Sequence, residues 1–289
     1  MPLNEWAIQR TLLVPAPAPS QPLPMSLNEW AIQRTLLALG LAFVTIFLGL
    51  APATWGGQAQ QLSFLGTDFV AYWVDLKVDD LGLFWKDAAG QPLGTFARLA
   101  AQETTPSREL KFAINAGIYS KDYVPLGLHV ERFQVLHPLN LKEPDKSQFN
   151  FYLKPNGVFF VRDGKADLLE SGDYARLDPQ PWLACQSGPL LLQNGRIHPA
   201  FRADSTNFHW RSGVGLTSTG QVVFAISKSP LRFHDFARLF QERLRCDRAL
   251  YLDGDICAIY LPELGYRGTE ATARFAAMFA VRSRRPSLP

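Results

Sequence analysis

The sequence predicts an α+β fold, a single compact domain of mixed, largely antiparallel sheets with a few helices. Short apolar runs dominate the chain, glycine-containing turn pairs separate many of them, and only two segments show clear helical periodicity. From about Leu62 onward, no linker and no change of composition divides the chain. One domain over residues 60–289 is therefore the simplest arrangement.

The strand-like runs are short, apolar and spread along most of the body. They are residues 68–76, 110–118, 126–133, 149–153, 158–162, 189–192, 213–217, 222–227 and 249–252. Pairs such as Asp163-Gly164, Asn194-Gly195 and Thr219-Gly220 fall between such runs. These pairs favour tight turns, so they indicate hairpins and hence antiparallel pairing.

Two helices are predicted, at residues 94–103 and 233–245. The second is amphipathic, because its large apolar side chains fall on one stripe at helical spacing: Phe233, Phe236, Phe240 and Leu244. We interpret this stripe as core packing and not as a cofactor site. The helix leads directly into the run 249–252, so Asp253-Gly254-Asp255 follows a strand that follows a helix.

The N-terminus has the features of a targeting segment. Residues 3–13 recur unchanged at 27–37, which indicates an upstream duplication over 1–24 and Met25 as the functional start. An apolar run at 36–51 follows Arg34 and precedes small residues, which is typical of a secretory signal within 25–59. A retained membrane anchor is the alternative. Either predicts a periplasmic or secreted domain, anchored at its N-terminus in the second case.

Charge and cysteine content exclude some classes of function. The net charge is +3 without a long basic block, which argues against nucleic acid as the main partner. The three cysteines form no C-x-x-C pair, so a zinc or thioredoxin-type site is not indicated. Cys246 and Cys257 suit either a disulfide or two separate thiols, and we favour the thiols.

Four clusters of polar residues and glycine interrupt the apolar runs, at 114–119, 185–189, 210–215 and 252–255. Their recurrence at strand ends favours one shared cleft over four unrelated turns. Arg211 offers a planar fork for a phosphate or a carboxylate, although a surface ion pair explains it equally well. Asp253, Asp255 and Glu131 are the candidate carboxylates for glycosyl transfer.

The motifs, in their order along the chain, resemble the phosphodiester glycosidase family, that of N-acetylglucosamine-1-phosphodiester α-N-acetylglucosaminidase, and most closely an exported bacterial branch. The residues that carry the resemblance are F-A-I-N-A-G-I-Y (112–119), P-L-G-L-H-V-E (125–131), N-F-Y-L-K-P-N-G-V-F (150–159), Q-S-G-P-L-L (186–191), R-S-G-V-G (211–215), H-D-F-A-R-L-F (234–240) and A-L-Y-L-D-G-D-I (249–256).

The resemblance implies an extracytoplasmic hydrolase that cleaves a sugar-1-phosphodiester at the anomeric C–O bond. It implies that Asp253 acts as base or nucleophile, while Asn115 and Glu131 orient the sugar or the water. The residues implied to bind the substrate, a phosphorylated carbohydrate or glycan, are Arg211, Ser187, Gly188, Gly117, Gly213, Gly254 and Asp255.

One departure from the family pattern leaves two alternatives open. The family reads D-G-G-G-S where this chain reads D-G-D-I-C, with Asp255 in place of a glycine and Cys257 in place of the serine. The first alternative is a non-catalytic envelope module that binds phosphate-bearing glycans. The second is a metal-assisted phosphodiesterase, in which Asp253 and Asp255 hold a divalent cation. No other cofactor is implied.

Overall fold

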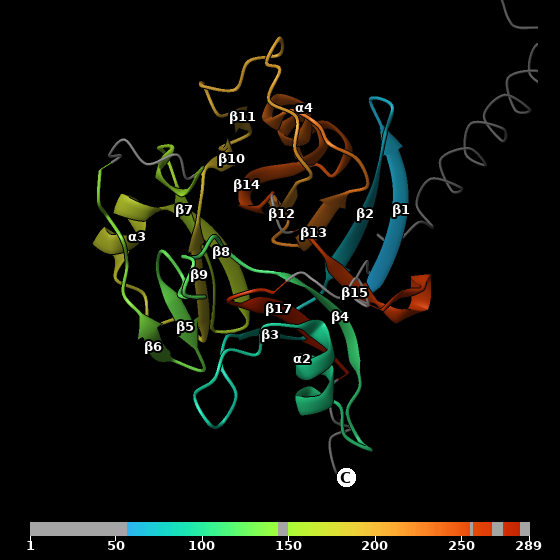
Figure 1. Ribbon diagram of the computed structural model, residues 1–289. Coiled ribbons are helices and arrows are strands. Elements are labelled where there is room, and N and C mark those ends of the chain that lie inside the picture. Colours follow the sequence, from blue (N-terminus) through green and yellow to red (C-terminus); the bar gives the residue numbers. More distant parts are fainter. Residues whose placement is uncertain (1–56, 144–149, 255–256, 268–273, 284–289) are drawn as a thin grey trace, which may run out of the picture. The chain divides into compact units, whose positions relative to one another are not determined.

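The computed structural model describes residues 57–143, 150–254, 257–267 and 274–283 (Figure 1). The duplicated segment, the apolar run at 36–51 and nearly all of the predicted signal or anchor lie outside these residues, so they and the predicted location stay predictions. Among the described residues, none of the helices has the length and apolar character needed to cross a membrane. The first strand, β1, begins at Gln58, two residues before the predicted start of the domain.

The described chain forms three sheets, and every strand pair in them is antiparallel. In spatial order, the first sheet contains β1 (Gln58–Phe64), β2 (Thr67–Val74), β13 (Val222–Ser227), β12 (Ser212–Thr217), β14 (Cys246–Asp253), β10 (Leu190–Gln193) and β11 (Arg196–Ile197). The second contains β16 (Tyr266–Arg267), β15 (Ile259–Leu261), β4 (Leu110–Asn115), β17 (Met278–Arg282) and β3 (Asp80–Phe84). The third contains β6 (Gln134–His137), β5 (His129–Glu131), β9 (Leu183–Ser187), β7 (Gly157–Arg162) and β8 (Lys165–Glu170). The predicted α+β class with largely antiparallel sheets is confirmed.

The three sheets share one core. Alternate residues of their strands point into it, among them Val214 and Leu250 of the first sheet, Ile114 and Phe279 of the second, and Phe159 of the third. Since side chains alternate between the faces of a strand, the remaining apolar residues line the other face of each sheet. Each sheet therefore needs a second covering layer.

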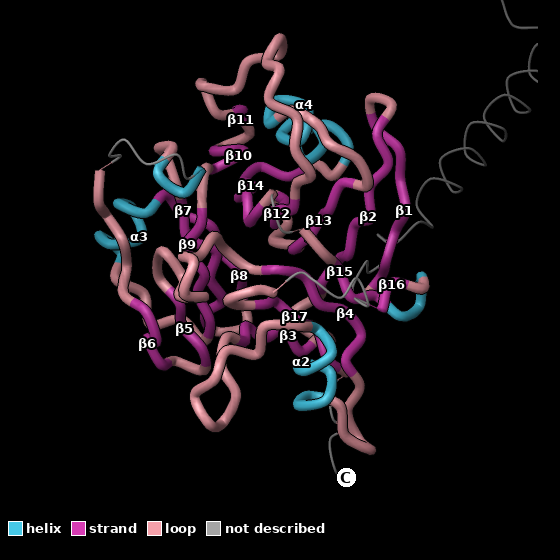
Figure 2. The backbone as a smooth tube through the Cα atoms, viewed as in Figure 1, coloured by secondary structure: helices cyan, strands magenta, loops and turns pink. Residues whose placement is uncertain are grey.

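One helix covers the second face of each sheet (Figures 1 and 2). Helix α4 (Phe233–Arg238) packs on the first sheet, α2 (Phe96–Glu103) on the second and α3 (Ser171–Leu177) on the third. The predicted aromatic stripe is core, because Phe236, Phe240 and Leu244 are buried. The strand ends that lie between these layers are thus held from both sides.

Both predicted helices form, with differences at their ends. Helix α2 begins after Thr95, whose hydroxyl accepts a hydrogen bond from the Arg98 backbone N–H at 3.2 Å. The helix predicted at 233–245 is regular only to Arg238 and continues as a π-helical turn over Leu239–Arg243. In that turn the Leu244 N–H donates to the Leu239 carbonyl at 3.0 Å. The two residues are five apart in sequence, whereas an α-helix joins residues four apart.

Two strand predictions from the sequence were wrong, and one helix was missed. The segment predicted as a strand at 149–153 forms a 3-10 turn at Asn150–Tyr152. Within this turn only Phe151 is buried, so the side chains do not alternate between buried and exposed as in a strand. The strand predicted at 126–133 shrinks to β5, because Arg132 and Phe133 have positive φ and turn the chain into β6. Helix α3 was not predicted, since only its Ser171 and Tyr174 are buried and no apolar stripe marks it.

The buried His198, which follows β11, leads us to expect that the stability of the fold decreases in acid. It is 5% exposed, its Nε2 lies 2.9 Å from the Lys154 carbonyl, and its Nδ1 accepts from the Ala200 N–H at 3.1 Å, so the ring is neutral. Burial lowers the pKa of His198 from its ordinary value of 6.5, although the Lys154 carbonyl opposes the shift. Below about pH 6.5 the unfolded chain therefore takes up a proton that the folded chain resists.

The expected result is a free energy of unfolding that falls as the pH drops through 6.5 towards the folded-state pKa of His198. Urea unfolding at a series of pH values measures this slope. His198→Gln keeps a donor and an acceptor without titrating, and it should flatten the slope. His209→Gln is the matched control, because His209 is exposed and should leave the slope as in the parent. An unchanged slope in His198→Gln would exclude His198 as the cause.

Candidate active site

Four strand ends meet between the sheets. β4 ends at Asn115, β9 ends at Ser187, β14 ends at Asp253, and β12 begins at Ser212. The second and third sheets contribute one end each, and the first sheet contributes the pair Ser212 and Asp253, which are register partners. The structure thus brings together residues from all four polar clusters that the sequence singled out.

Ser212 joins three of these segments through its hydroxyl. The Ser212 Oγ accepts from Asn115 Nδ2 at 2.9 Å and donates to the Asp253 carbonyl at 3.0 Å. The Asp253 N–H returns a longer bond of 3.3 Å to the same oxygen. Because Asn115 and Ser212 are both buried, these bonds are shielded from water and hold the Asp253 backbone firmly.

Ser187 attaches the fourth segment in a similar way. Its hydroxyl donates to the Leu252 carbonyl at 3.1 Å and accepts from the Ile118 N–H at 3.4 Å. Gly117 permits this approach, since a Cβ there would lie 2.7 Å from the Gln186 carbonyl oxygen and 3.2 Å from the Ser187 Cβ. The Asn-x-Gly motif therefore owes its glycine to close packing of β9 on the loop after β4.

The Asp253 carboxylate stands at the edge of this network. Asp253 is half-buried, and its Oδ1 accepts from the Gly254 N–H at 2.6 Å. Its negative charge affects the nearby Tyr119. The pKa of Tyr119 is raised mainly by burial, and further by the charge of Asp253 and by the neighbouring Tyr123. The Tyr119 phenol thus stays protonated and donates to the Arg274 carbonyl. Asp253 is therefore a carboxylate in a partly dry setting.

Arg211 points to the other side of the strand. Its side chain is fully buried, Nε donates to the Leu231 carbonyl at 2.8 Å, and Nη2 donates to Asn207 Oδ1 at 3.0 Å. The guanidinium lies 3.5 Å over the ring of Phe233 at the start of α4. These contacts tie the loop before β12 to the helix behind it. A phosphate-binding role for Arg211 stays a prediction, and this burial does not favour it.

Glu131 lies away from the group around Asp253. It is the register partner of Leu183, four residues before Ser187 on β9, which places it about 13 Å along the strand at about 3.3 Å per residue. Its Oε1 accepts from the Trp85 N–H at 2.7 Å and lies 2.7 Å from His129 Nε2. Glu131 thus ties β5 to the residue after β3, and its predicted catalytic role has no geometric support.

The remaining predicted site residues have mixed positions. Gly188 packs against Asn156 and Gly213 against the rings of Phe236 and Phe240, so both serve close packing next to the site. Asp255 lies outside the described residues, so the predicted cation pair of Asp253 and Asp255 stays a prediction. Within the described residues, no group of three or more histidine, cysteine or acidic side chains is arranged to hold a metal.

Cys257 occupies the place of the family serine and has a contact that a serine would also make. Its thiol donates to the carbonyls of Asp253 at 2.8 Å and Gly254 at 3.5 Å. Cys246 donates instead to the Leu244 carbonyl, so the structure holds the two residues as separate thiols, as favoured from the sequence. Cys257 therefore ties the segment after the turn to the backbone of Asp253 and Gly254.

We expect Cys257→Ser to retain the stability of the parent, whereas Cys257→Ala should lose about 1 kcal/mol because the carbonyls lose this donor. Thermal unfolding of both variants measures the difference. Cys246→Ser and Cys246→Ala form the matched control pair, in a buried position remote from the turn. Equal stability of Cys257→Ser and Cys257→Ala would show that the thiol bond contributes nothing.

Two residues that complete the site were underrated by sequence reasoning. Ser212 and Tyr119 lie inside the polar clusters, but the residue types predicted site roles for Arg211 and Asn115 instead. One signal for Ser212 was available. It is the first residue of a strand and follows Arg211, and consecutive side chains in extended backbone point to opposite sides. Nothing in the sequence pattern distinguishes Tyr119, since its contact with Arg274 spans 155 residues.

Comparison with known proteins agrees with this set of residues. A sequence model of the phosphodiester glycosidase family matches residues 108–256, which include Asn115, Ser187, Ser212 and Asp253. The chain belongs to the phosphodiester glycosidase family. It is also 34% identical over 191 residues to the uncharacterized protein YigE of Escherichia coli strain K12, covering 66% of this chain and 73% of that protein.

Solved structures share the fold of this phosphodiester glycosidase domain at low identity. A hypothetical protein from Synechocystis superposes with a TM-score of 0.55 at 14% identity, covering 78% of this chain and 62% of that one. The catalytic domain of zebrafish N-acetylglucosamine-1-phosphodiester α-N-acetylglucosaminidase, auto-inhibited by its pro-peptide, superposes with a TM-score of 0.53 at 12% identity, covering 78% and 82%. These likenesses support the fold.

Proposed function

We propose that this domain hydrolyses a sugar-1-phosphodiester at the anomeric C–O bond, with Asp253 as base or nucleophile. The observation that supports it is the convergence of the four family motifs on one half-buried carboxylate, whose backbone Ser212 holds through two hydrogen bonds. The zebrafish relative is named for hydrolysis of this class of bond, which supports the same reaction here. Membership of the family makes phosphodiester-linked sugars the substrate class.

The chemistry needs few groups. A water oxygen bonds to the anomeric carbon and gives up one proton to the carboxylate or to solvent, the bond from that carbon to the phosphate oxygen breaks, and its electron pair stays on the phosphate. The products are a free sugar and a phosphomonoester. Because the phosphate is a good leaving group, the demand for a strong general acid is low. One carboxylate, held in a partly dry site, meets the remaining need to activate water or to stabilise the anomeric centre.

The test is turnover of a panel of sugar-1-phosphodiesters in ¹⁸O-labelled water, with and without a chelator. The expected product carries the label on the sugar, which reports C–O cleavage, and forms equally well with chelator present. Label on the phosphate, lost when chelator is added, would instead support the metal-assisted phosphodiesterase. Binding of the panel without any turnover would support the non-catalytic module.

A further inference from the structure

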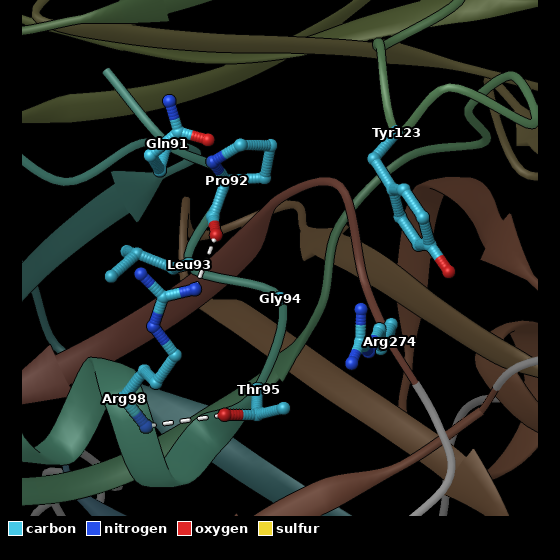
Figure 3. A pocket seen from close by; sticks show the side chains of 8 residues that line it. All are labelled: Gln91, Pro92, Leu93, Gly94, Thr95, Arg98, Tyr123 and Arg274. Atoms are coloured by element: carbon cyan, nitrogen blue, oxygen red, sulfur yellow. Dashed lines mark hydrogen bonds between the residues drawn. The ribbon is translucent and has the colours of Figure 1, made fainter. Parts of the chain in front are cut away.

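A pocket of about 320 Å³ (Figure 3) has two lining residues in contact with Tyr119. Its lining residues are Gln91, Pro92, Leu93, Gly94, Thr95, Arg98, Tyr123 and Arg274. Two contacts attach it to the site: the Tyr119 ring stacks on Tyr123 with centroids 5.7 Å apart, and the Tyr119 phenol donates to the Arg274 carbonyl. Tyr119 thus contacts two residues of the pocket, and the charge of Asp253 also acts on it.

The pocket is lined by two cations and no acid. Arg98 is already engaged, since it donates to the Asp87 carboxylate at 2.8 Å and to the Pro92 carbonyl at 2.9 Å. Arg274 differs, because its guanidinium makes no hydrogen bond or ion pair within the part of the chain that the structure describes, and it is exposed. In Figure 3 the Arg274 side chain lies between Tyr123 and Gly94. Its planar donor fork is therefore available to an anion.

We propose that this pocket binds the phosphorylated leaving group of the substrate, with Arg274 pairing with its phosphate. The inference rests on the proposed function. A phosphodiester carries one negative charge, and the phosphomonoester that C–O cleavage releases carries nearly two at neutral pH, so a cation here favours the product side of the bond. The neutral sugar gains no charge pairing from an arginine, so we assign the pocket to the phosphate side.

The walls of the pocket fit an organic phosphate. Pro92 presents apolar surface, Tyr123 presents a flat ring, and Thr95 presents a hydroxyl (Figure 3). The volume of about 320 Å³ falls in the range of small-molecule sites. Arg211 is fully buried behind its strand, whereas Arg274 is open to solvent next to Tyr119. Arg274 is therefore the better placed of the two for a phosphate.

The test measures binding of glucose 6-phosphate, with glucose as the neutral counterpart, to the full chain by isothermal titration calorimetry. Glucose 6-phosphate should bind and glucose should not, and Arg274→Gln should weaken binding at least tenfold while leaving thermal unfolding unchanged. The control is Arg243→Gln, which removes an equally charged, exposed arginine that does not line the pocket. It should bind within about twofold of the parent.

Two results would overturn the subsite: binding untouched by Arg274→Gln, or an equal loss in Arg274→Gln and in the control. Its failure is distinguishable from failure of the proposed function. If the chain turns over sugar-1-phosphodiesters but Arg274→Gln does not change phosphomonoester binding, the subsite is excluded and the reaction stands. If phosphomonoester binding depends on Arg274 but the chain turns over no phosphodiester, both the reaction and the leaving-group role of the pocket are excluded.

Discussion

Asp253→Asn is expected to lower kcat/KM for sugar-1-phosphodiesters by about 100-fold or more, which is the lower range for loss of a catalytic acid or base. The amide is nearly isosteric with the carboxylate and keeps an oxygen to accept the Gly254 N–H. The two bonds between Ser212 and the Asp253 backbone do not involve the side chain. The loss should therefore be chemical, with the fold preserved.

Asp247→Asn is the matched control, because Asp247 lies on the same strand at its opposite end and is exposed. It should retain the parent rate. Both variants should unfold within about 3 °C of the parent, equivalent to about 1 kcal/mol for a domain of this size. Parent-like turnover in Asp253→Asn would remove Asp253 from the mechanism, and equal losses in both variants would point to a general charge effect.

Gly254→Ala is the second change with a large expected effect. A Cβ at residue 254 would lie 1.9 Å from Tyr251 Oη and 2.8 Å from the Trp210 carbonyl oxygen. Tyr251 is buried and packs against Phe233 with ring centroids 4.8 Å apart, so the turn has to move instead. We expect a loss of about 1–3 kcal/mol in stability from overpacking. A displacement of Asp253 by about 1 Å should cost about 100-fold in kcat/KM.

A double-mutant cycle with Tyr251→Phe tests the cause. Removing the Tyr251 hydroxyl deletes the 1.9 Å contact and leaves the nearest atoms of Trp210 and Tyr251 at 2.8 and 3.2 Å. Gly254→Ala should therefore cost less stability and less activity in the Tyr251→Phe background than in the parent. Equal costs in both backgrounds would show that the hydroxyl is not the obstacle.

Local patterns predicted most of the fold. The turn pairs at 163–164, 194–195 and 219–220 do join antiparallel neighbours, because a tight turn and the flanking strands are encoded within a few residues. The stripe of Phe236 and Phe240 similarly predicted a buried helix. Helix α3 was missed because its stability comes from the Glu170 side-chain cap and from Tyr174, which leave no periodic signal.

The site itself was predictable only in part. Asp253, Asn115, Ser187 and Gly117 were identified from their motifs, and the structure brings them together. Glu131 is instead about 13 Å along a strand from Ser187, and Arg211 is buried on the opposite face of β12. Both are polar residues inside family-like motifs, and nothing local shows which way a side chain points or which end of a strand meets its neighbour.

The sequence by itself determined the class of fold, the hairpins, the ordered motifs and through them the family. These depend on residues that are neighbours along the chain, where periodicity and turn chemistry act directly. Only the tertiary structure decided that Ser212 joins Asn115 to Asp253, and that Tyr119 contacts Arg274. Those contacts bridge 97 and 155 residues in two cases, and they arise from how three sheets share one core. A slip of one residue in any strand would turn these side chains to the other face.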